Sequence, residues 1–287
     1  MRKITVISGK GGTGKTTVVS NLAALADNLV LADCDVDAPN MHLLMQPDIQ
    51  EDKVFISAKL AVKDKNKCIN CGKCREACRF NAVDEEFEIN PIKCDGCGVC
   101  VYICPEGALR LEEQETGHIF ISTTRFAPMV HARLKAGAEN SGKLVSRVRD
   151  FADKIAEEKG KDLVLVDGSP GIGCPVIASL KGIDYSLVVT EPTLSGLSDL
   201  KRVLEVTKLF DINAFVIINK YDINKDISQK IEQYCVKNNV EVIGRISFSP
   251  LINQAMREGK LLVNMFPDSI PASEINAIWS EISGQID

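Results

Sequence analysis

Two groups of residues in this chain have the types and spacing to do chemistry. The first runs from Gly9 to Thr17 and follows the pattern G-x-x-x-x-G-K-[ST]. Such a loop curls tightly enough to aim successive backbone N–H groups at phosphate oxygens. In this pattern Lys15 reaches the terminal phosphates and Thr16 binds Mg²⁺. The predicted phosphate site comprises Gly9, Lys10, Gly11, Gly12, Thr13, Gly14, Lys15, Thr16 and Thr17.

The local context favours this interpretation over a glycine turn that merely caps a helix. The loop follows Ile4–Ile7, an apolar run rich in β-branched residues, and precedes Val18–Leu25, whose apolar residues have helical periodicity. Strand, turn and helix therefore occur in the order that a phosphate loop requires.

The second group consists of eight cysteines between Cys68 and Cys104. They form two C-x2-C-x2-C-x3-C runs, and the second run, which starts at Cys94, is followed by Pro105. Bacterial two-cluster ferredoxins have this spacing, and the fourth cysteine of each run binds the other cluster. We therefore predict one [4Fe–4S] cluster on Cys68, Cys71, Cys74 and Cys104, and a second on Cys94, Cys97, Cys100 and Cys78.

Two features of the cysteine runs leave an alternative open. Pairs of the form C-x2-C also bind zinc, although the doubled three-plus-one arrangement favours clusters. Arg79 stands where the second run carries its proline, which would place a cation near the second cluster. Either metal would hold this segment folded without a large apolar core.

The overall composition limits the classes of protein that fit. A net charge of −5 argues against a general nucleic-acid binder, because such proteins neutralise phosphates. No apolar run approaches the roughly 20 residues that span a bilayer, so we expect no membrane insertion. Met1–Lys3 leads directly into a strand and does not resemble a signal peptide, so we expect a cytoplasmic protein. There, cysteines serve metal binding more often than disulfides.

Buried strands that end in aspartates must position the phosphate chemistry. Leu29–Ala32 leads into Asp33, Cys34 and Asp35, and Leu163–Val166 leads into Asp167. Further apolar runs at 54–57, 118–122, 185–190, 214–218 and 242–246 alternate with helical patterns. We predict an α/β fold with a doubly wound, mostly parallel sheet, formed by residues 1–60 and 115–287. Residues 61–114 would form an inserted, small α+β domain of the bacterial-ferredoxin type.

These motifs resemble those of the MinD/ParA/Mrp/nitrogenase-iron-protein group of ATPases, which carry a deviant Walker A motif. The resemblance rests on K-G-G-T-G-K-T from Lys10, on D-x-D…P-N from Asp33, and on the strand that ends at Asp167. It implies that Lys10 reaches the nucleotide of a second subunit, so that a homodimer or a paralogous heterodimer completes the site. It also implies that Asp35 orients the attacking water, whereas Asp33 and Asp167 support Mg²⁺. A solvated acidic turn remains the alternative, above all for Asp37.

The same resemblance implies weaker assignments near the base and at a subunit interface. Asn219 would contact the adenine, and Pro250 would lie in the base-binding loop. Cys174 lies seven residues after Asp167, where the nitrogenase iron protein carries an intersubunit cluster ligand. The second such ligand is absent, because 138–141 reads Ala-Glu-Asn-Ser. Two copies of Cys174 could still hold a metal at a dimer axis, or Cys174 could be a small buried side chain, as we expect for Cys34 and Cys235.

The last apolar pattern is helical and comprises Ile275, Ile278, Trp279, Ile282 and Ile286. MinD uses a terminal amphipathic helix to bind membranes, but the polar side here carries Glu274 and Glu281 and no basic residue. We therefore expect this helix to pack on the body of the protein. His42, His118 and His131 form no recognisable site.

Three functions follow from combining the motifs. The first is an ATP-driven dimer cycle coupled to electron transfer through the clusters to an unidentified redox or metalloprotein partner. The second is an ATPase that carries or assembles iron–sulfur units, as in the Mrp group. The third is a positioning ATPase like ParA or MinD, which would give the eight paired cysteines no purpose.

Overall fold

The computed structural model describes residues 1–138 and 141–286. The chain forms two compact units. The first comprises Met1–Asp52, Ile119–Arg133 and Ser141–Asp287, and the second comprises Lys53–His118 and Leu134–Asn140. The predicted iron–sulfur insertion at 61–114 has other boundaries than the second unit and stays a prediction.

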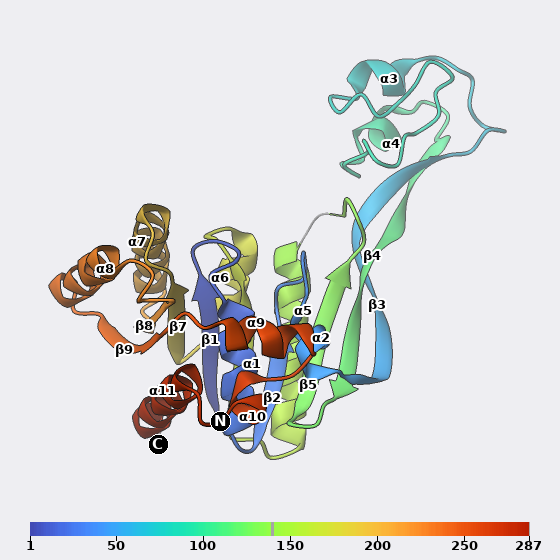
Figure 1. Cartoon of the computed structure of the whole chain (residues 1–287). Coiled ribbons are helices and arrows are strands. Elements are labelled where there is room, and N and C mark those ends of the chain that lie inside the picture. Colours follow the sequence, from blue (N-terminus) through green and yellow to red (C-terminus); the bar gives the residue numbers. More distant parts are fainter. Residues whose placement is uncertain (139–140, 287) are drawn as a thin grey trace. The chain divides into compact units, whose positions relative to one another are not determined.

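A parallel sheet is the centre of the first unit (Figure 1). Seven strands are hydrogen-bonded side by side in the order β5-β2-β6-β1-β7-β8-β9, and each neighbouring pair among them is parallel. The strands are β1 (Arg2–Ser8), β2 (Leu29–Asp33), β5 (Pro128–Leu134), β6 (Leu163–Pro170), β7 (Tyr185–Thr190), β8 (Asn213–Asn219) and β9 (Glu241–Ile246). The predicted mostly parallel α/β fold is therefore confirmed.

Helices cover both faces of this sheet, which is why its strands are apolar on both sides. Leu187 and Val188 are neighbours on β7, yet each is buried in a different core cluster. One cluster joins the sheet to α1 (Lys15–Leu25), α2 (Met41–Met45), α10 (Leu262–Met265) and α11 (Ile270–Ile286). The other joins it to α6 (Cys174–Leu180), α7 (Leu194–Leu209) and α8 (Lys225–Lys237). The remaining helices of this unit are α5 (Ser141–Glu158) and α9 (Pro250–Arg257).

Helix α11 packs on the body of the first unit, as the sequence predicts. Ile275, Ile278 and Ile282 are buried in the core, and Trp279 is partly buried against it. Ile278 lies so close to Gly244 of β9 that a Cβ on Gly244 would overlap its side chain. The side chain of Ile286, which the same pattern includes, lies outside the described residues. Within the described part of the chain, no helix is both long enough and apolar enough to cross a membrane.

Three strands differ from the sequence-based expectation. The short strand expected at 54–57 is part of β3 (Asp48–Lys63), and the one expected at 118–122 is part of β4 (Leu109–Thr123). Strand β5 was not expected, because its buried residues Met129, Val130 and Ala132 alternate with His131 and Arg133 without a clear apolar run. His131 is itself buried, and its Nε2 lies 3.0 Å from the Ser122 hydroxyl.

The second unit contains a structural repeat that follows the repeat in the cysteines. Helices α3 (Lys73–Ala77) and α4 (Val99–Ile103) each begin after a left-handed glycine, Gly72 and Gly98, with φ of 78° in both. Neither helix has a fully buried residue. The fourth cysteine of each run accepts a backbone N–H at its Sγ, from Ala82 at 3.4 Å for Cys78 and from Ala108 at 3.3 Å for Cys104.

Candidate functional site

The glycine-rich loop between β1 and α1 has the shape that the sequence predicts. Gly12 and Gly14 have φ of 80° and 90°, in the left-handed region that favours glycine. A Cβ on Gly14 would overlap the side-chain amide of Asn219, and a Cβ on Gly9 would overlap Asp199 of α7. These glycines therefore let the loop approach its neighbours closely.

Carboxylates from two adjacent strands surround Lys15. Asp33, the last residue of β2, is the register partner of Asp167, which lies within β6 because that strand continues to Pro170 beyond its expected end. Both are almost fully buried. The Lys15 ammonium group donates to Asp167 Oδ1, and it lies 3.9 Å from Asp35 Oδ2. Burial works to lower the pKa of Lys15, but the neighbouring carboxylates, above all Asp167, raise it above its ordinary value.

Burial destabilises the ionised forms of these acidic groups. Burial, followed by the charge of Asp167, raises the pKa of Asp33 well above its ordinary value. Burial also raises the pKa of Asp35, against the opposing charge of Lys15. Asp33 Oδ2 and Asp167 Oδ2 are buried without a hydrogen-bond partner among the described residues. Oxygen atoms of this kind are the ligands that Mg²⁺ and its bound waters prefer, so the residues fit a hydrated Mg²⁺.

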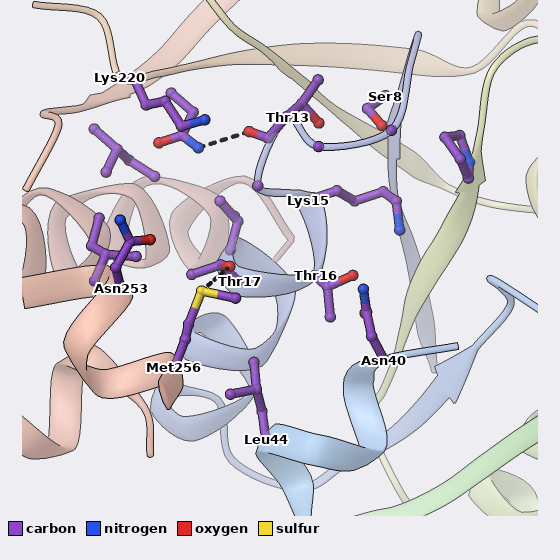
Figure 2. A pocket seen from close by; sticks show the side chains of 18 of the residues that line it. Ser8, Thr13, Lys15, Thr16, Thr17, Asn40, Leu44, Lys220, Asn253 and Met256 are labelled. Carbon is purple, nitrogen blue, oxygen red and sulfur yellow. Dashed lines mark hydrogen bonds between the residues drawn. The ribbon is translucent and has the colours of Figure 1, made fainter. Parts of the chain in front are cut away.

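A cavity of about 430 Å³ opens beside the loop and is lined by both polar and apolar side chains (Figure 2). Residues 11–18 of the loop and helix α1 line it, together with Asp35 and Asn40. Its lining also includes Leu43, Phe248, Ile252, Asn253 and Met256, among others. This combination fits the phosphates and the base of a nucleotide.

Sequence reasoning did not identify the cavity residues that α9 contributes. Met256 lies one turn after Ile252 and Asn253 on α9, and the Thr17 hydroxyl lies 3.4 Å from Met256 Sδ (Figure 2). Their spacing is that of one helical face, but an ordinary core-facing helix shows the same pattern. The available signal therefore could not distinguish a base pocket from packing.

The two residues assigned to adenine have different surroundings. The Asn219 side chain donates to the backbone oxygen of Thr13 at 2.7 Å and also lines the cavity. Pro250 begins α9 and does not line the cavity, whereas its neighbours Ser249 and Ile252 do. A contact between the base and either residue stays a prediction.

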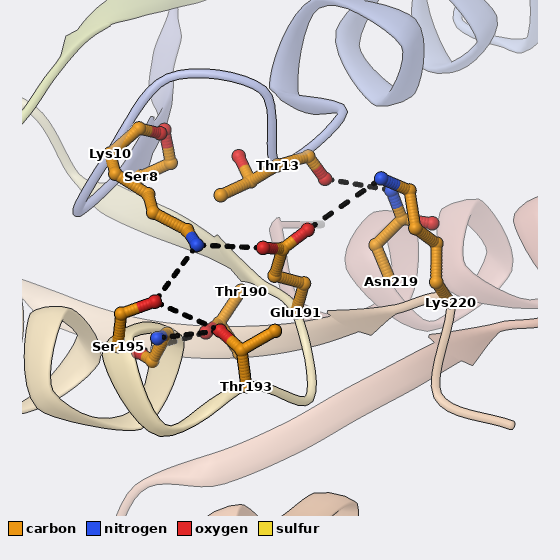
Figure 3. Close-up of polar contacts among 10 residues, drawn as sticks. Ser8, Lys10, Thr13, Thr190, Glu191, Thr193, Ser195, Asn219 and Lys220 are labelled. Carbon is orange, nitrogen blue, oxygen red and sulfur yellow. Dashed lines mark hydrogen bonds and ion pairs between the residues drawn. The ribbon is translucent and has the colours of Figure 1, made fainter. Parts of the chain in front are cut away.

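Lys10 makes polar contacts with the turn that joins β7 to α7 and with the first turn of α7 (Figure 3). Its ammonium group is 2.7 Å from Glu191 Oε1 and donates to Ser195 Oγ at 3.0 Å. Lys10 therefore points away from the carboxylates that surround Lys15.

The eight paired cysteines gather in two cavities of the second unit. One cavity is lined by Cys68, Cys71, Cys74 and Cys104, and the other by Cys78, Cys94, Cys97 and Cys100. Each cavity thus combines three cysteines of one run with the fourth cysteine of the other. None of the eight forms a disulfide with another described cysteine.

Four thiols at each cavity could hold either an iron–sulfur cluster or a metal ion. Among the described residues, no group of three or more His, Cys, Asp or Glu side chains is arranged to hold one metal ion. In a cubane each thiolate binds a different iron atom, so its four sulfurs stand farther apart than the ligands of one ion. Burial raises the pKa of Cys74 and of Cys100, and an iron–sulfur cluster would hold them as thiolates.

The other three cysteines have different surroundings. Cys34 and Cys235 are fully buried, as predicted, and burial raises the pKa of both thiols, that of Cys235 to about 11. Cys174 is exposed at the start of α6, so it is not the buried apolar side chain that the sequence allowed. A Cβ on Gly142 of α5 would lie 3.2 Å from Cys174 Cβ. Of the segment 138–141, which lacks a second ligand, residues 139–140 lie outside the described residues.

Comparison with known proteins extends over nearly the whole chain. Residues 4–263 match the family model described as the CobQ/CobB/MinD/ParA nucleotide binding domain. An uncharacterized protein of Methanocaldococcus jannaschii is 38% identical over 226 residues, which are 77% of this chain and 79% of that protein. A shorter stretch of 52 residues, 18% of this chain and 64% of the relative, is 40% identical to pyruvate synthase subunit PorD of Methanothermobacter marburgensis.

The fold is similar to that of solved structures in the same family. The septum site-determining protein MinD of Pyrococcus horikoshii, complexed with Mg-ADP, superimposes with a TM-score of 0.61 and 20% identity. The match covers 100% of this chain and 98% of that one. Together with the geometry of the loop and its cavity, the family match establishes that this chain belongs to the CobQ/CobB/MinD/ParA family of nucleotide-binding domains.

Proposed function

We propose that this protein is a Mg²⁺-dependent ATPase whose nucleotide-driven pairing of two subunits controls electron transfer through two [4Fe–4S] clusters to a metalloprotein partner. One observation carries the proposal. A chain with the phosphate loop and cavity of this ATPase family also has two cavities, each lined by three cysteines of one run and the fourth of the other.

The nucleotide part assigns a role to each group around the loop. The loop N–H groups and Lys15 would bind the phosphates, while Thr16, Asp33 and Asp167 would hold hydrated Mg²⁺. Asp35, near Lys15 and lining the cavity, would orient the attacking water. The unpartnered oxygens of Asp33 and Asp167 support the magnesium assignment. Lys10 would act on the nucleotide of a second subunit, which is either an identical copy or a paralogue.

The iron–sulfur part rests on the second unit. Residues 61–114 would form the ferredoxin-like domain, and 1–60 with 115–287 would form the ATPase domain. When bound, the clusters supply one-electron chemistry. The backbone N–H groups of Ala82 and Ala108 donate hydrogen bonds to the sulfur atoms of Cys78 and Cys104. Hydrogen bonds of this kind to ligand atoms tune the properties of a metal centre. The likeness of a short stretch to a pyruvate synthase subunit supports a redox role.

A carrier or assembly ATPase is the second candidate, and the exposure of two cysteines favours it. Cys71 and Cys97 occupy equivalent positions in the two runs, and both are exposed. Ligands open to solvent allow exchange with an acceptor protein. In this version, the ATPase cycle would control the delivery of iron–sulfur units rather than of electrons.

Anaerobic purification of the full chain tests the metal assignment first. We expect about eight iron and eight sulfide ions per chain, and EPR signals of reduced cubanes after dithionite. One zinc per cysteine quartet would contradict the cluster assignment. A chain that binds ATP but takes up neither metal would instead leave a positioning ATPase of the MinD kind as the better description.

The dependence of cluster chemistry on ATP separates the two candidates. For electron transfer, the clusters stay bound through turnover, and oxidation of the reduced clusters by a metalloprotein acceptor requires ATP. For delivery, labelled iron leaves the protein and appears in an apo-ferredoxin. Lys10→Ala should abolish either effect of ATP, whereas Lys208→Ala, an exposed lysine on α7, should not. Rates that do not respond to ATP in either assay would end the coupling proposal.

A further inference from the structure

One carboxylate lies between two lysines at the carboxyl edge of the sheet (Figure 3). Glu191 immediately follows β7. Its Oε1 is 2.7 Å from Lys10 Nζ, and its Oε2 is 3.6 Å from Lys220 Nζ. The residues that bring these charges together follow β1, β7 and β8, so the contact depends on the parallel sheet and not on local sequence.

The turn from β7 to α7 holds Glu191 firmly. Thr193 caps α7 by accepting the N–H of Gly196 at 2.9 Å, and its own N–H donates to the Glu191 backbone oxygen at 2.8 Å. A Cβ on Gly196 would overlap that same backbone oxygen. The Thr190 hydroxyl donates to the Gly196 oxygen at 3.2 Å. The carboxylate is therefore carried by a closely packed helix cap.

The same cap supplies a second partner for Lys10. Ser195 Oγ accepts from Lys10 Nζ at 3.0 Å and lies 3.1 Å from the Thr193 hydroxyl. The Lys10 and Glu191 side chains are 32% and 18% exposed, so the pair is only partly screened by water. Two hydrogen-bond partners fixed on one cap define a single orientation for the lysine.

We propose that Glu191 and Ser195 are positioning residues for Lys10: they hold its ammonium group against its own subunit until a nucleotide in a second subunit competes for it. This inference rests on the proposed dimer cycle, in which Lys10 contacts the nucleotide of the partner. Release is made easier by Lys220, because Glu191 keeps a cation at its other oxygen when Lys10 departs. The contact thereby opposes pairing in the absence of a competing phosphate.

The first experiment measures Lys10 in the nucleotide-free full chain, independently of any dimer. Limited reductive methylation with formaldehyde, quantified by mass spectrometry, reports how accessible each amine is. Glu191→Gln should increase labelling of Lys10 about threefold, the effect of removing one partly exposed ion pair. The exposed Lys208 of α7 provides the internal reference. Equal labelling of Lys10 in the two proteins would overturn the inference.

The second experiment measures pairing by analytical ultracentrifugation with AMPPNP and Mg²⁺. Two copies of the contact break in each dimer, so a threefold effect per subunit predicts a dissociation constant about tenfold lower for Glu191→Gln. Ser195→Ala should act in the same direction with a smaller effect. Glu191→Asp, which keeps the charge, should restore part of the wild-type value. Glu241→Gln removes an exposed glutamate of β9 and is the matched control.

A double variant identifies Lys10 as the group through which Glu191 acts. In a Lys10→Ala background, Glu191→Gln should no longer change the dissociation constant of any residual pairing, because Glu191 acts through Lys10. A merely structural role of Glu191 would still change it. Increased labelling with unchanged pairing would overturn the positioning role. A wild-type protein that stays monomeric with AMPPNP and Mg²⁺ would contradict the dimer cycle and with it the exchange. Failure of labelling alone would contradict the cis contact while leaving the dimer cycle intact.

Discussion

At the scale of single residues, the buried carboxylates of β2 and β6 lower the stability of the metal-free protein. Asp33 and Asp167 are register partners buried side by side, and one oxygen of each has no partner among the described residues. Lys15 donates to Asp167, and the Asp35 N–H donates to Asp33 Oδ1 at 3.1 Å. A folded protein tolerates such a cluster because the rest of its core is apolar and well packed.

We predict that Asp33→Asn stabilises the metal-free protein at neutral pH by on the order of 1 kcal/mol or more. The folded pKa of Asp33 is raised above its ordinary 3.8, so the wild type loses stability as pH rises from that value through the folded pKa. The variant lacks this loss. Urea unfolding in EDTA at several pH values measures the difference between the two proteins. Asp268→Asn, at an exposed aspartate, is the control.

The variant must be compared with the wild type because the titration of His131 changes the stability of both proteins with pH in the opposite direction. Burial lowers its pKa from 6.5 to about 4, so its contribution is lost as pH falls through that range in both proteins. The stabilising effect of Asp33→Asn should be accompanied by loss of Mg²⁺-dependent ATP hydrolysis. Equal stability of wild type and variant at pH 7 would contradict the electrostatic account.

Asn219 offers a second test at this scale. Asn219→Ala removes the hydrogen bond to the Thr13 oxygen and should weaken ATP binding about tenfold, or about 1.4 kcal/mol. Isothermal titration with ATP and with GTP shows which role dominates. An equal loss for both nucleotides identifies support of the phosphate loop, and a loss confined to ATP identifies adenine recognition. Asn276→Ala, whose amide bonds only within α11, is the control.

At the scale of elements, α11 illustrates how packing decides between two uses of an amphipathic helix. Ile278→Ala should cost about 3 kcal/mol of unfolding free energy, because it leaves a cavity against β9. Ile270→Ala, at a side chain that is 71% exposed, should cost less than about 0.5 kcal/mol. Urea unfolding measures both. Sedimentation of the wild type with anionic vesicles would contradict the expectation that this helix only packs on the body.

The crossed arrangement of the cysteine runs is also a property of elements. Cys71→Ala should lower the iron content from about eight to about four per chain. Adding Cys104→Ala should change nothing further, because both residues line one cavity. Adding Cys78→Ala instead should remove nearly all iron, since that residue lines the other cavity. The reverse result would show that each run binds its own cluster. Cys235→Ala, at a buried cysteine outside both runs, is the control.

At the scale of the whole molecule, the two units differ in what holds them folded. The first has an apolar core on both faces of its sheet, whereas α3 and α4 of the second have no fully buried residue. We predict that removing iron with a chelator increases protease cleavage within 61–114 about tenfold. ATP affinity, measured on the same sample, should stay within about twofold of its original value. Loss of nucleotide binding with the iron would contradict separate stabilisation.

Much of this architecture is local information and could be predicted. The phosphate loop can be predicted because Gly9–Thr17 combines glycines, Lys15 and Thr16 in one short stretch between a strand and a helix. The eight cysteines and their offset are visible for the same reason. Strand β5 was missed and β3 was predicted too short, because their side chains lack a continuous apolar run.

The sequence alone determined the parallel α/β fold, the loop, the candidate carboxylates and the grouping of the cysteines, because periodicity and short spacings report local geometry. Only the tertiary structure decided which side chains from distant parts of the sequence contact one another. Met256 and Asn253 line the nucleotide cavity from α9. Glu191, which follows a strand, contacts Lys10, which lies 181 residues earlier in the sequence. Such contacts depend on the order of strands in the sheet, which no short stretch of sequence encodes.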